Sequence, residues 1–266
     1  MEAETFETLR CEVAEGVATL TLARPQALNA FSQPMQRELA RLIPRLAEDP
    51  AVRAVLLTGA GRAFCAGGDI REMDTVEDAS PLAARERLQR MLHTVLMPLV
   101  RLPKPVVAAV NGPAFGAGMN LALAADVVLA ADTATFSQAF VKVGLVPDTG
   151  GLYLLTRLVG LQVAKDLCLT GRTINADEAA RLGLVGQVVP TADLMGVARA
   201  KALEFARGAT AAIGLTKTLL NMAPDATLEQ MAEVEASALA IALSTEDHRE
   251  GIRAFIEKRA PRFGGR

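Results

Sequence analysis

The chain of 266 residues contains no tryptophan, one tyrosine, two histidines and three cysteines. His93 and His248 stand far apart and in no metal-ligand spacing, so neither a catalytic zinc centre nor any other metal site is expected. Three cysteines cannot form a disulfide framework, which favours a reducing compartment. Cys65 lies beside a glycine-rich loop and resembles a nucleophile, but no histidine is near it in sequence. We interpret it as a packing residue.

Neither sign of charge dominates, since 28 basic side chains accompany 30 acidic ones. This balance offers no basic surface, so nucleic acid and anionic membrane are not expected as partners. The acidic start over residues 1–7 lacks the positive end and apolar run of a signal peptide. The apolar stretch 105–131 is interrupted by Asn111, Asn120 and Asp126, which predicts buried elements rather than a membrane span. We therefore expect a cytoplasmic protein.

Apolar periodicity divides the chain into two regions. Up to residue 192, short strands alternate with helices, which predicts an α/β domain with parallel pairing. The expected strands are Val17–Leu22, Val52–Thr58, Pro105–Val110 and Val127–Ala130, and the expected helices are Pro34–Leu46, one around 91–96 and Met119–Ala125. Over 193–266 only helical spacing remains, in segments 192–206, 211–222, 228–243 and 245–256. We expect this second region to pack on the first or on a neighbouring subunit.

Two loops repeat one arrangement, in which a buried strand leads through small residues into a helix. The first contains Gly67 and Gly68 before Asp69-x-x-Glu72, which predicts an exposed backbone turn and a helix capping box. The second covers residues 111–120. Two loops of this kind can direct their N–H groups at one carbonyl oxygen and hold it as it becomes an oxyanion. Each loop alone is equally consistent with an ordinary strand-to-helix turn.

A third loop, residues 143–151, places Asp148 after an apolar run and just before a helix that begins near Thr149. Aspartate at such a position most often caps the helix. In an apolar pocket, however, burial would raise the pKa of Asp148 and allow the carboxyl group to move protons. The loop by itself leaves both interpretations open.

Several catalytic motifs are incomplete. Phe64 stands where a dinucleotide-binding G-x-G-x-x-G loop requires glycine. Tyr153 is followed four residues later by Arg157 rather than by the lysine of a Tyr-x-x-x-Lys dehydrogenase pair. The sequence contains neither a G-x-S-x-G elbow nor a phosphate-binding P-loop. Nicotinamide chemistry and serine hydrolysis are therefore not expected.

Taken together and in order, segments 24–31, 61–69, 111–118, 144–151 and 255–263 resemble the crotonase (enoyl-CoA hydratase/isomerase) superfamily. The resemblance implies a spiral of ββα units over residues 1–192 and a helical trimerisation region over residues 193–266. It also implies acyl-CoA thioester substrates and assembly as a homotrimer or as a hexamer of two trimers. No cofactor is expected, because coenzyme A is part of the substrate.

Carried over position by position, the resemblance assigns roles to individual residues. The backbone N–H groups of Gly68 and Ala117 would stabilise the thioester enolate. The substrate would be lined by Ala27, Leu28, Ala66, Gly67, Asp69, Ile70, Asn120 and Phe140. Candidates for contacting the phosphates of coenzyme A are Arg24, Arg62 and Lys258, the last from a neighbouring subunit.

The chain departs from the hydratases of this superfamily at both catalytic glutamates. Their positions hold Asn120 and Phe140, and neither side chain can cycle a proton at neutral pH. Asp148 remains, where several isomerases of the superfamily carry their single catalytic carboxylate. Segments 139–148 and 249–255 are most similar to the phenylacetyl-CoA-pathway isomerases. We therefore expect an enoyl-CoA isomerase or an isomerase of the ring-epoxide phenylacetyl-CoA type, with Asp148 as its acid and base.

Three alternatives remain beside this expectation. The chain could hydrate enoyl-CoA by a route that uses Asp148 and water. It could be a dehalogenase with Asp148 as nucleophile, although such enzymes also use a tryptophan, which this chain lacks; His93 could lie near that site. It could finally be a non-catalytic acyl-CoA-binding protein.

Overall fold

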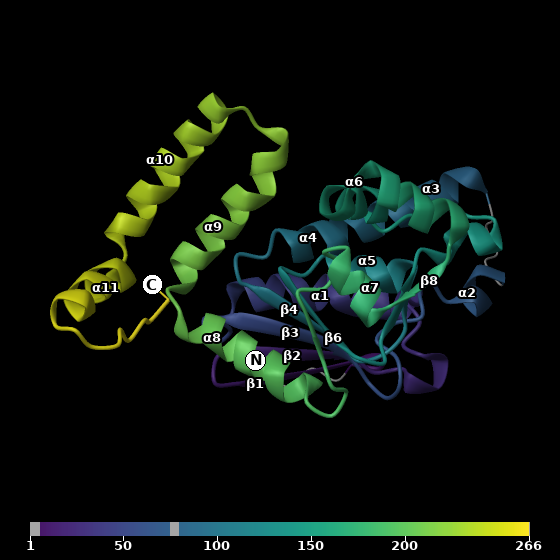
Figure 1. Cartoon of the computed structure of the whole chain (residues 1–266), viewed down its shortest axis with the longest axis horizontal. Coiled ribbons are helices and arrows are strands. Elements are labelled where there is room, and N and C mark those ends of the chain that lie inside the picture. Colours follow the sequence, from purple (N-terminus) through teal and green to yellow (C-terminus); the bar gives the residue numbers. More distant parts are fainter. Residues whose placement is uncertain (1–5, 75–79, 266) are drawn as a thin grey trace.

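The computed structural model of the chain describes residues 6–74 and 80–265, and a six-stranded sheet lies at its centre (Figure 1). The first pair of strands in this sheet is antiparallel and the remaining neighbours are parallel. In spatial order the strands are β1 (Leu9–Ala14), β2 (Val17–Leu22), β3 (Ala54–Gly59), β4 (Val106–Val110), β6 (Val127–Ala131) and β9 (Gln187–Val189). Every residue of β3 and β4 is buried, because helices and loops cover both faces of a parallel sheet.

A second, three-stranded sheet lies beside the first and carries part of the candidate site. Its strands are β5 (Ala114–Phe115), β7 (Thr135–Ser137) and β8 (Thr173–Asn175), in that spatial order. β5 leads directly into helix α5 (Ala117–Leu123), and β7 leads into the 3-10 turn η3 (Ala139–Val143). The small sheet therefore places the second candidate loop next to the start of η3.

Helix α1 (Gln33–Glu48) shows how local sequence sets an element. Ser32 caps it by accepting the backbone N–H of Met35, and a proline occupies its first turn. The side chains at 39, 42, 43 and 46 form one buried face, as the apolar spacing predicts. The other helical elements of the first 192 residues are η1 (Pro25–Ala27), α2 (Ile70–Asp74), α3 (Pro81–Met91), the π-helical turn η2 (Leu92–Leu96), α4 (Met97–Val100), α6 (Gly151–Thr170) and α7 (Ala176–Arg181).

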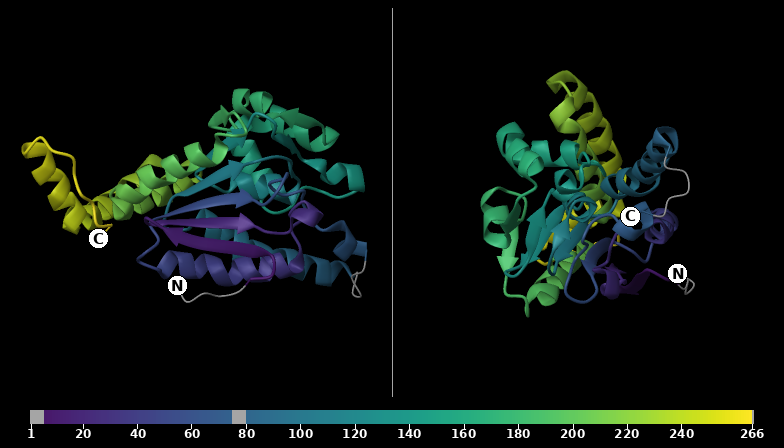
Figure 2. Two further views of the ribbon diagram at one scale, coloured as in Figure 1. Left: turned by 90° about the horizontal axis from the view of Figure 1, so that it is seen from below. Right: turned by 90° about the vertical axis from the view of Figure 1, so that its right-hand side faces the viewer.

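The C-terminal region begins with α8 (Leu194–Arg207), which packs against β3 and β4 through a buried alanine-rich face. The packed core therefore extends past the predicted boundary at residue 192. Beyond it, helices α9 (Thr210–Met222), α10 (Leu228–Ser244) and α11 (Glu246–Ile256) form an arm that projects away from the sheets (Figures 1 and 2). A 3-10 turn, η4 (Ala223–Asp225), connects α9 to α10.

Polar contacts attach the arm to the core both at the base of α9 and at its far end, where Asn221 donates to the carbonyl of Val100 at 3.1 Å and Asp225 of η4 pairs with Arg157 of α6. The ammonium group of Lys217 on α9 is buried and lies 2.8 Å from the carboxylate of Asp126, which is partly exposed. The C-terminal tail returns to this base, where Arg53 donates to the carbonyl of Phe263 at 2.9 Å (Figure 1). None of the residues of α10 is buried, although the helix carries several large apolar side chains.

Most elements expected from apolar periodicity are present, including the helical C-terminal region. Strand β1 and the strands of two or three residues escaped prediction, because β1 is an edge strand with polar side chains and the others are too short to show a period. Over the described ranges, no helix is both long and apolar enough to cross a membrane. Residues 1–5 of the acidic start lie outside those ranges.

Candidate active site

The first candidate loop is fixed to the turn formed by η1. The backbone N–H of Ala66 donates to the carbonyl of Leu28 at 3.0 Å, and that of Phe31 donates to the carbonyl of Gly67 at 2.7 Å. Gly67 has a φ of +99°, a conformation that L side chains rarely adopt. The expected substrate-lining residues Ala27 and Leu28 are thus brought against the loop that ends in Gly67 and Gly68.

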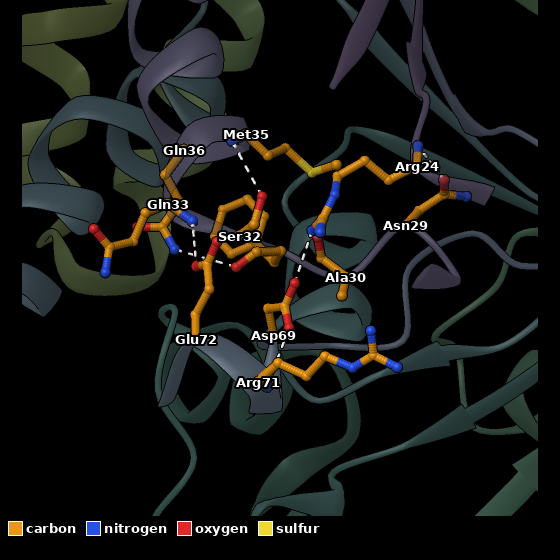
Figure 3. A network of polar contacts seen from close by, with 11 residues as sticks. Arg24, Asn29, Ala30, Ser32, Gln33, Met35, Gln36, Asp69, Arg71 and Glu72 are labelled. Carbon is orange, nitrogen blue, oxygen red and sulfur yellow. Dashed lines mark hydrogen bonds and ion pairs between the residues drawn. The ribbon is translucent and has the colours of Figure 1, made fainter. Parts of the chain in front are cut away.

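A network of polar contacts continues from this loop to the start of α1 (Figure 3). The guanidinium of Arg24 donates to the Asp69 carboxylate at 2.9 Å and to the carbonyl of Ala30 at 3.1 Å. Burial opposes the ionisation of Asp69, but Arg24 and nearby N–H groups hold its pKa below the usual value. Arg24 therefore connects the first loop to the turn before α1. Because its guanidinium pairs with Asp69, it is less available to bind a phosphate of coenzyme A, the role expected from the sequence.

Asp69 occupies the capping position expected at the start of α2. The backbone N–H of Arg71 donates to Asp69 at 3.2 Å, so Asp69 does cap the helix. The Glu72 carboxylate accepts the backbone N–H of Gln33 at 2.7 Å, which connects α2 to the first residue of α1 (Figure 3). Both acidic side chains thus contribute to one bonded network around the first loop.

The first and second loops are in direct backbone contact. The N–H of Cys65 donates to the carbonyl of Pro113, and the N–H of Phe115 donates to the carbonyl of Cys65. A Cβ on Gly118 would lie 2.1 Å from the Cys65 oxygen, and one on Gly112 would lie 2.1 Å from the Arg62 oxygen. Glycine is required at these positions because no other residue permits such an approach.

This contact brings the two expected oxyanion donors together. Ala117 is the first residue of α5, so its N–H has no acceptor within the helix. A Cβ on Gly67, the neighbour of Gly68, would lie 3.9 Å from that nitrogen. The ring of Phe140 is buried and lies against Gly116, where a Cβ would meet it at 3.4 Å. An apolar ring therefore covers the backbone next to one donor.

Asp148 lies on the third loop, half-buried, and burial raises the pKa of its carboxyl group. The hydroxyl of Thr149 donates to Asp148 Oδ1 at 2.8 Å and only partly offsets this effect. Within the described residues Asp148 has no ion-pair partner. Helix α6 begins at Gly151, and the N–H of Gly151 donates to the backbone carbonyl of Asp148 at 2.9 Å rather than to its carboxylate. The capping interpretation therefore receives no support from this bond.

Asn120 lies one helical turn after Ala117 and is completely buried. Its Nδ2 donates to the backbone carbonyl of Asp148 at 2.8 Å, and its Oδ1 accepts from Nε2 of Gln138 at 2.7 Å. The expected substrate-lining residue Asn120 is thus connected to the Asp148 loop. Sequence reasoning missed Gln138 and Thr149, since no local motif surrounds either residue.

The remaining expected residues are distributed over a wider surface. Ile70 is 67% exposed and directly follows Asp69, at the end of the first loop. Arg62 is exposed on the same loop, whereas Lys258 is exposed at the end of α11, on the projecting arm (Figure 1). Ala66 is partly buried. One chain therefore places Arg62, but not Lys258, near its own three loops.

Cys65 is completely buried, and burial raises the pKa of its thiol to about 12. Its interpretation as a packing residue is confirmed, because a thiol in this state is a poor nucleophile. Among the residues that the structure describes, no group of three or more His, Cys, Asp or Glu side chains could hold a metal ion.

Comparison with known proteins identifies the family. The model of the enoyl-CoA hydratase/isomerase family matches residues 12–266. The chain is 40% identical over 263 residues to 1,2-epoxyphenylacetyl-CoA isomerase of Escherichia coli, which covers 98% of this chain and 100% of that protein. It is 38% identical over 247 residues to short-chain-enoyl-CoA hydratase of Clostridium acetobutylicum, covering 91% and 92% of the two chains.

The solved structures agree with this family. A crystal structure of enoyl-CoA hydratase/isomerase from Cupriavidus metallidurans has a TM-score of 0.92 at 37% identity, over 97% of each chain. The chain therefore belongs to the enoyl-CoA hydratase/isomerase family. It is an acyl-CoA enzyme with the α/β crotonase fold, as the five sequence segments predict. Its relatives carry the names of isomerases and of hydratases.

Proposed function

We propose that this enzyme is an isomerase of acyl-CoA thioesters that uses Asp148 as its single acid and base. The observation that carries the proposal is a half-buried carboxyl group of raised pKa without an ion-pair partner in the described structure. The backbone carbonyl of the same residue accepts from Asn120, which lies on the helix that begins at Ala117. A carboxyl group poised in this way can accept a proton and return it.

The proposed reaction balances with one carboxylate. With a 3-enoyl-CoA, Asp148 removes a proton from C2, and the electrons move onto the thioester oxygen as a dienolate. The N–H groups of Gly68 and Ala117 stabilise that oxygen while its charge develops. Asp148 then returns the proton to C4, which leaves the 2-enoyl-CoA. No water is consumed, so the reaction needs neither of the two glutamates that Asn120 and Phe140 replace.

A second substrate class is favoured by one relative. The isomerase of Escherichia coli that shares 40% identity acts, by its name, on 1,2-epoxyphenylacetyl-CoA. We include ring-epoxide phenylacetyl-CoA thioesters among the proposed substrates for this reason. Hydration of 2-enoyl-CoA is the rival reaction, because another relative is a short-chain-enoyl-CoA hydratase.

We also propose that the chain assembles as a homotrimer or as a hexamer of two trimers. Helix α10 supports this proposal because it exposes Leu228, Leu239 and Ile241 by 55% or more. A helix that exposes several large apolar side chains is a candidate for protein–protein contacts. In such an assembly Lys258 of one chain and Arg62 of another are the proposed contacts for coenzyme A phosphates.

The test mixes the enzyme and its Asp148→Asn variant separately with 3-enoyl-CoA, 2-enoyl-CoA and the ring-epoxide thioester, and identifies products by mass spectrometry and absorbance. We expect isomerisation by the native enzyme and a loss of about 10²- to 10⁴-fold in the variant, the usual contribution of a positioned acid or base. If the enzyme adds water to 2-enoyl-CoA and forms no isomer from the other substrates, the proposal is wrong and the enzyme is a hydratase.

A further inference from the structure

The side-chain amide of Asn120 is oriented by its two partners. A backbone carbonyl can only accept a hydrogen bond, so Asn120 must face the carbonyl of Asp148 with its nitrogen. Its oxygen then faces Gln138, which must in turn present its own nitrogen. Hydrogen bonds therefore run in one direction, from Gln138 through Asn120 to the backbone of Asp148. We refer to these three residues as the amide relay.

The end of the relay lies at a strained part of the third loop. Thr149 is buried, with 2% exposure, and has a φ of +48°. A β-branched residue adopts this left-handed conformation only where its surroundings hold it there. The carbonyl of Asp148 accepts from both Asn120 and Gly151, and Thr149 donates to the Asp148 carboxylate. Two bonds thus hold the backbone of Asp148, and the Thr149 hydroxyl holds its carboxylate.

The α6 backbone lies close to the amide of Asn120 on one side. A Cβ on Gly151 would lie 2.3 Å from Asn120 Nδ2, so the α6 backbone already touches the amide. A glutamate at position 120 would have to displace this backbone. As a carboxylate it would also lack the proton that the Asp148 carbonyl accepts.

We propose that Asn120 is a positioning residue, oriented by Gln138, that holds Asp148 in place and restricts the site to chemistry with one carboxylate. This inference rests on the proposed role of Asp148 as the base. It predicts that a break in the relay slows proton transfer more than it weakens thioester binding, since most residues expected to line the substrate lie on η1 and the first loop.

The test measures exchange of the α-protons of phenylacetyl-CoA in D₂O by mass spectrometry, as a function of thioester concentration. Removal of an α-proton by Asp148 gives the enolate, the carboxyl group exchanges its proton with solvent, and a deuteron returns to the same carbon. Exchange therefore reports the base whichever product the enzyme forms with other substrates. Asp148→Asn establishes that the exchange depends on this carboxylate.

Two variants interrupt the relay at different points. Asn120→Asp replaces the donating NH₂ by oxygen at nearly constant volume, and Gln138→Leu removes the group that orients Asn120. We expect each to lower the maximal exchange rate by about 10- to 100-fold, the cost of a small misplacement of a catalytic group. The KM for phenylacetyl-CoA should change by less than about threefold, because ground-state binding is retained.

Thr58→Val is the matched control. Thr58 is buried in β3, and its hydroxyl donates to the carbonyl of Ala109 at 2.9 Å. Its replacement costs a buried hydrogen bond remote from Asp148, so the melting temperature should fall while the exchange rate per folded enzyme is kept. Exchange at the native rate in Asn120→Asp and Gln138→Leu, or a decrease only in proportion to the unfolded fraction, would overturn the positioning role.

The experiment separates this inference from the proposed function. If the native enzyme exchanges α-protons but isomerises none of the thioesters, the proposed reaction is wrong while the variants still decide the role of Asn120. If the native enzyme shows neither exchange nor isomerisation, Asp148 is not the base, and both proposals are overturned. If it isomerises 3-enoyl-CoA without exchanging phenylacetyl-CoA, the same variants are compared by the rate of that isomerisation.

Discussion

Gly118 on α5 faces the backbone oxygen of Cys65 so closely that a Cβ on the glycine would lie 2.1 Å from that oxygen. The two residues belong to different loops, and their contact fixes the distance between the expected oxyanion donors. The contact joins a backbone oxygen of Cys65 to a glycine, which has no side chain. A larger residue at position 118 could therefore not be accommodated by rotation of a side chain.

Alanine substitution at two helical glycines should have opposite effects on stability. Gly118→Ala should lower the free energy of unfolding by about 1–3 kcal/mol, because the added methyl group forces backbone apart. Gly196→Ala in α8 should raise it by about 0.5–1 kcal/mol, since nothing lies within 4 Å of the added carbon and alanine favours the helix. Urea unfolding of both variants measures this, and equal effects would contradict the contact.

Asp148→Asn should raise the melting temperature at pH 7. Burial raises the pKa of Asp148 in the folded chain, so the folded state binds its proton more tightly than the unfolded state. Above the pKa that Asp148 has in the folded chain, its ionised carboxylate lowers the free energy of unfolding. Below the pKa that Asp148 has in the unfolded chain, this destabilisation is absent. We expect the advantage of the variant to shrink as the pH falls towards 4. An advantage that stays constant with pH would show that charge is not its cause.

The pH dependence of catalysis should reflect the same carboxyl group. Proton removal needs the ionised form of Asp148, and its pKa lies above the ordinary value of 3.8. The value of kcat/KM should therefore fall on acidification at a pH higher than an exposed aspartate would give. Rates measured against pH, with folding followed by circular dichroism, distinguish this titration from acid unfolding.

Lys217→Met should destabilise the chain by about 1–3 kcal/mol, because it removes a buried cation that donates to the partly exposed Asp126 carboxylate. Burial raises the pKa of Asp126 and lowers that of Lys217, so desolvation outweighs their attraction at both groups. The double variant Lys217→Met/Asp126→Asn should recover part of the loss, since it buries no unpaired charge. Chemical unfolding of the two variants tests this.

Leu239→Asp on α10 should shift the protein towards monomer. Leu239 is 60% exposed in the isolated chain, and a charge at this position would have to be buried in the proposed assembly. Glu235→Gln on the same helix is the control, because it removes an exposed charge and adds none. Light scattering after gel filtration measures the masses. A native protein that is already monomeric would contradict the assembly.

The sequence predicted those parts of the site that depend on local signals. The glycines before Asp69 and around Gly116, and the Pro147-Asp148 pair, identify the three loops because turns and helix starts need these residue types. The buried strands, their parallel pairing and most helix bounds followed from apolar periodicity, whereas the order of the strands in the sheet did not.

The remaining features depend on contacts between distant residues. Gln138 meets Asn120 across 18 positions, and Asn120 meets Asp148 across 28, so no window of sequence contains the relay. Arg24 is a free cation by sequence, but it pairs with Asp69 across 45 positions in the folded chain. Pairings of this kind follow from how the loops pack, which periodicity does not specify.

The position of Phe140 has a consequence for solvent at the site. Its ring lies against Gly116, beside the N–H of Ala117, and keeps water away from that side of the backbone. A hydrogen bond to a developing negative charge is stronger where the surroundings are less polarisable by water. The same ring occupies the position from which a hydratase glutamate would activate a water molecule. In the proposed isomerase mechanism, exclusion of water by this ring would strengthen the contact with the enolate and deprive hydration of its reactant.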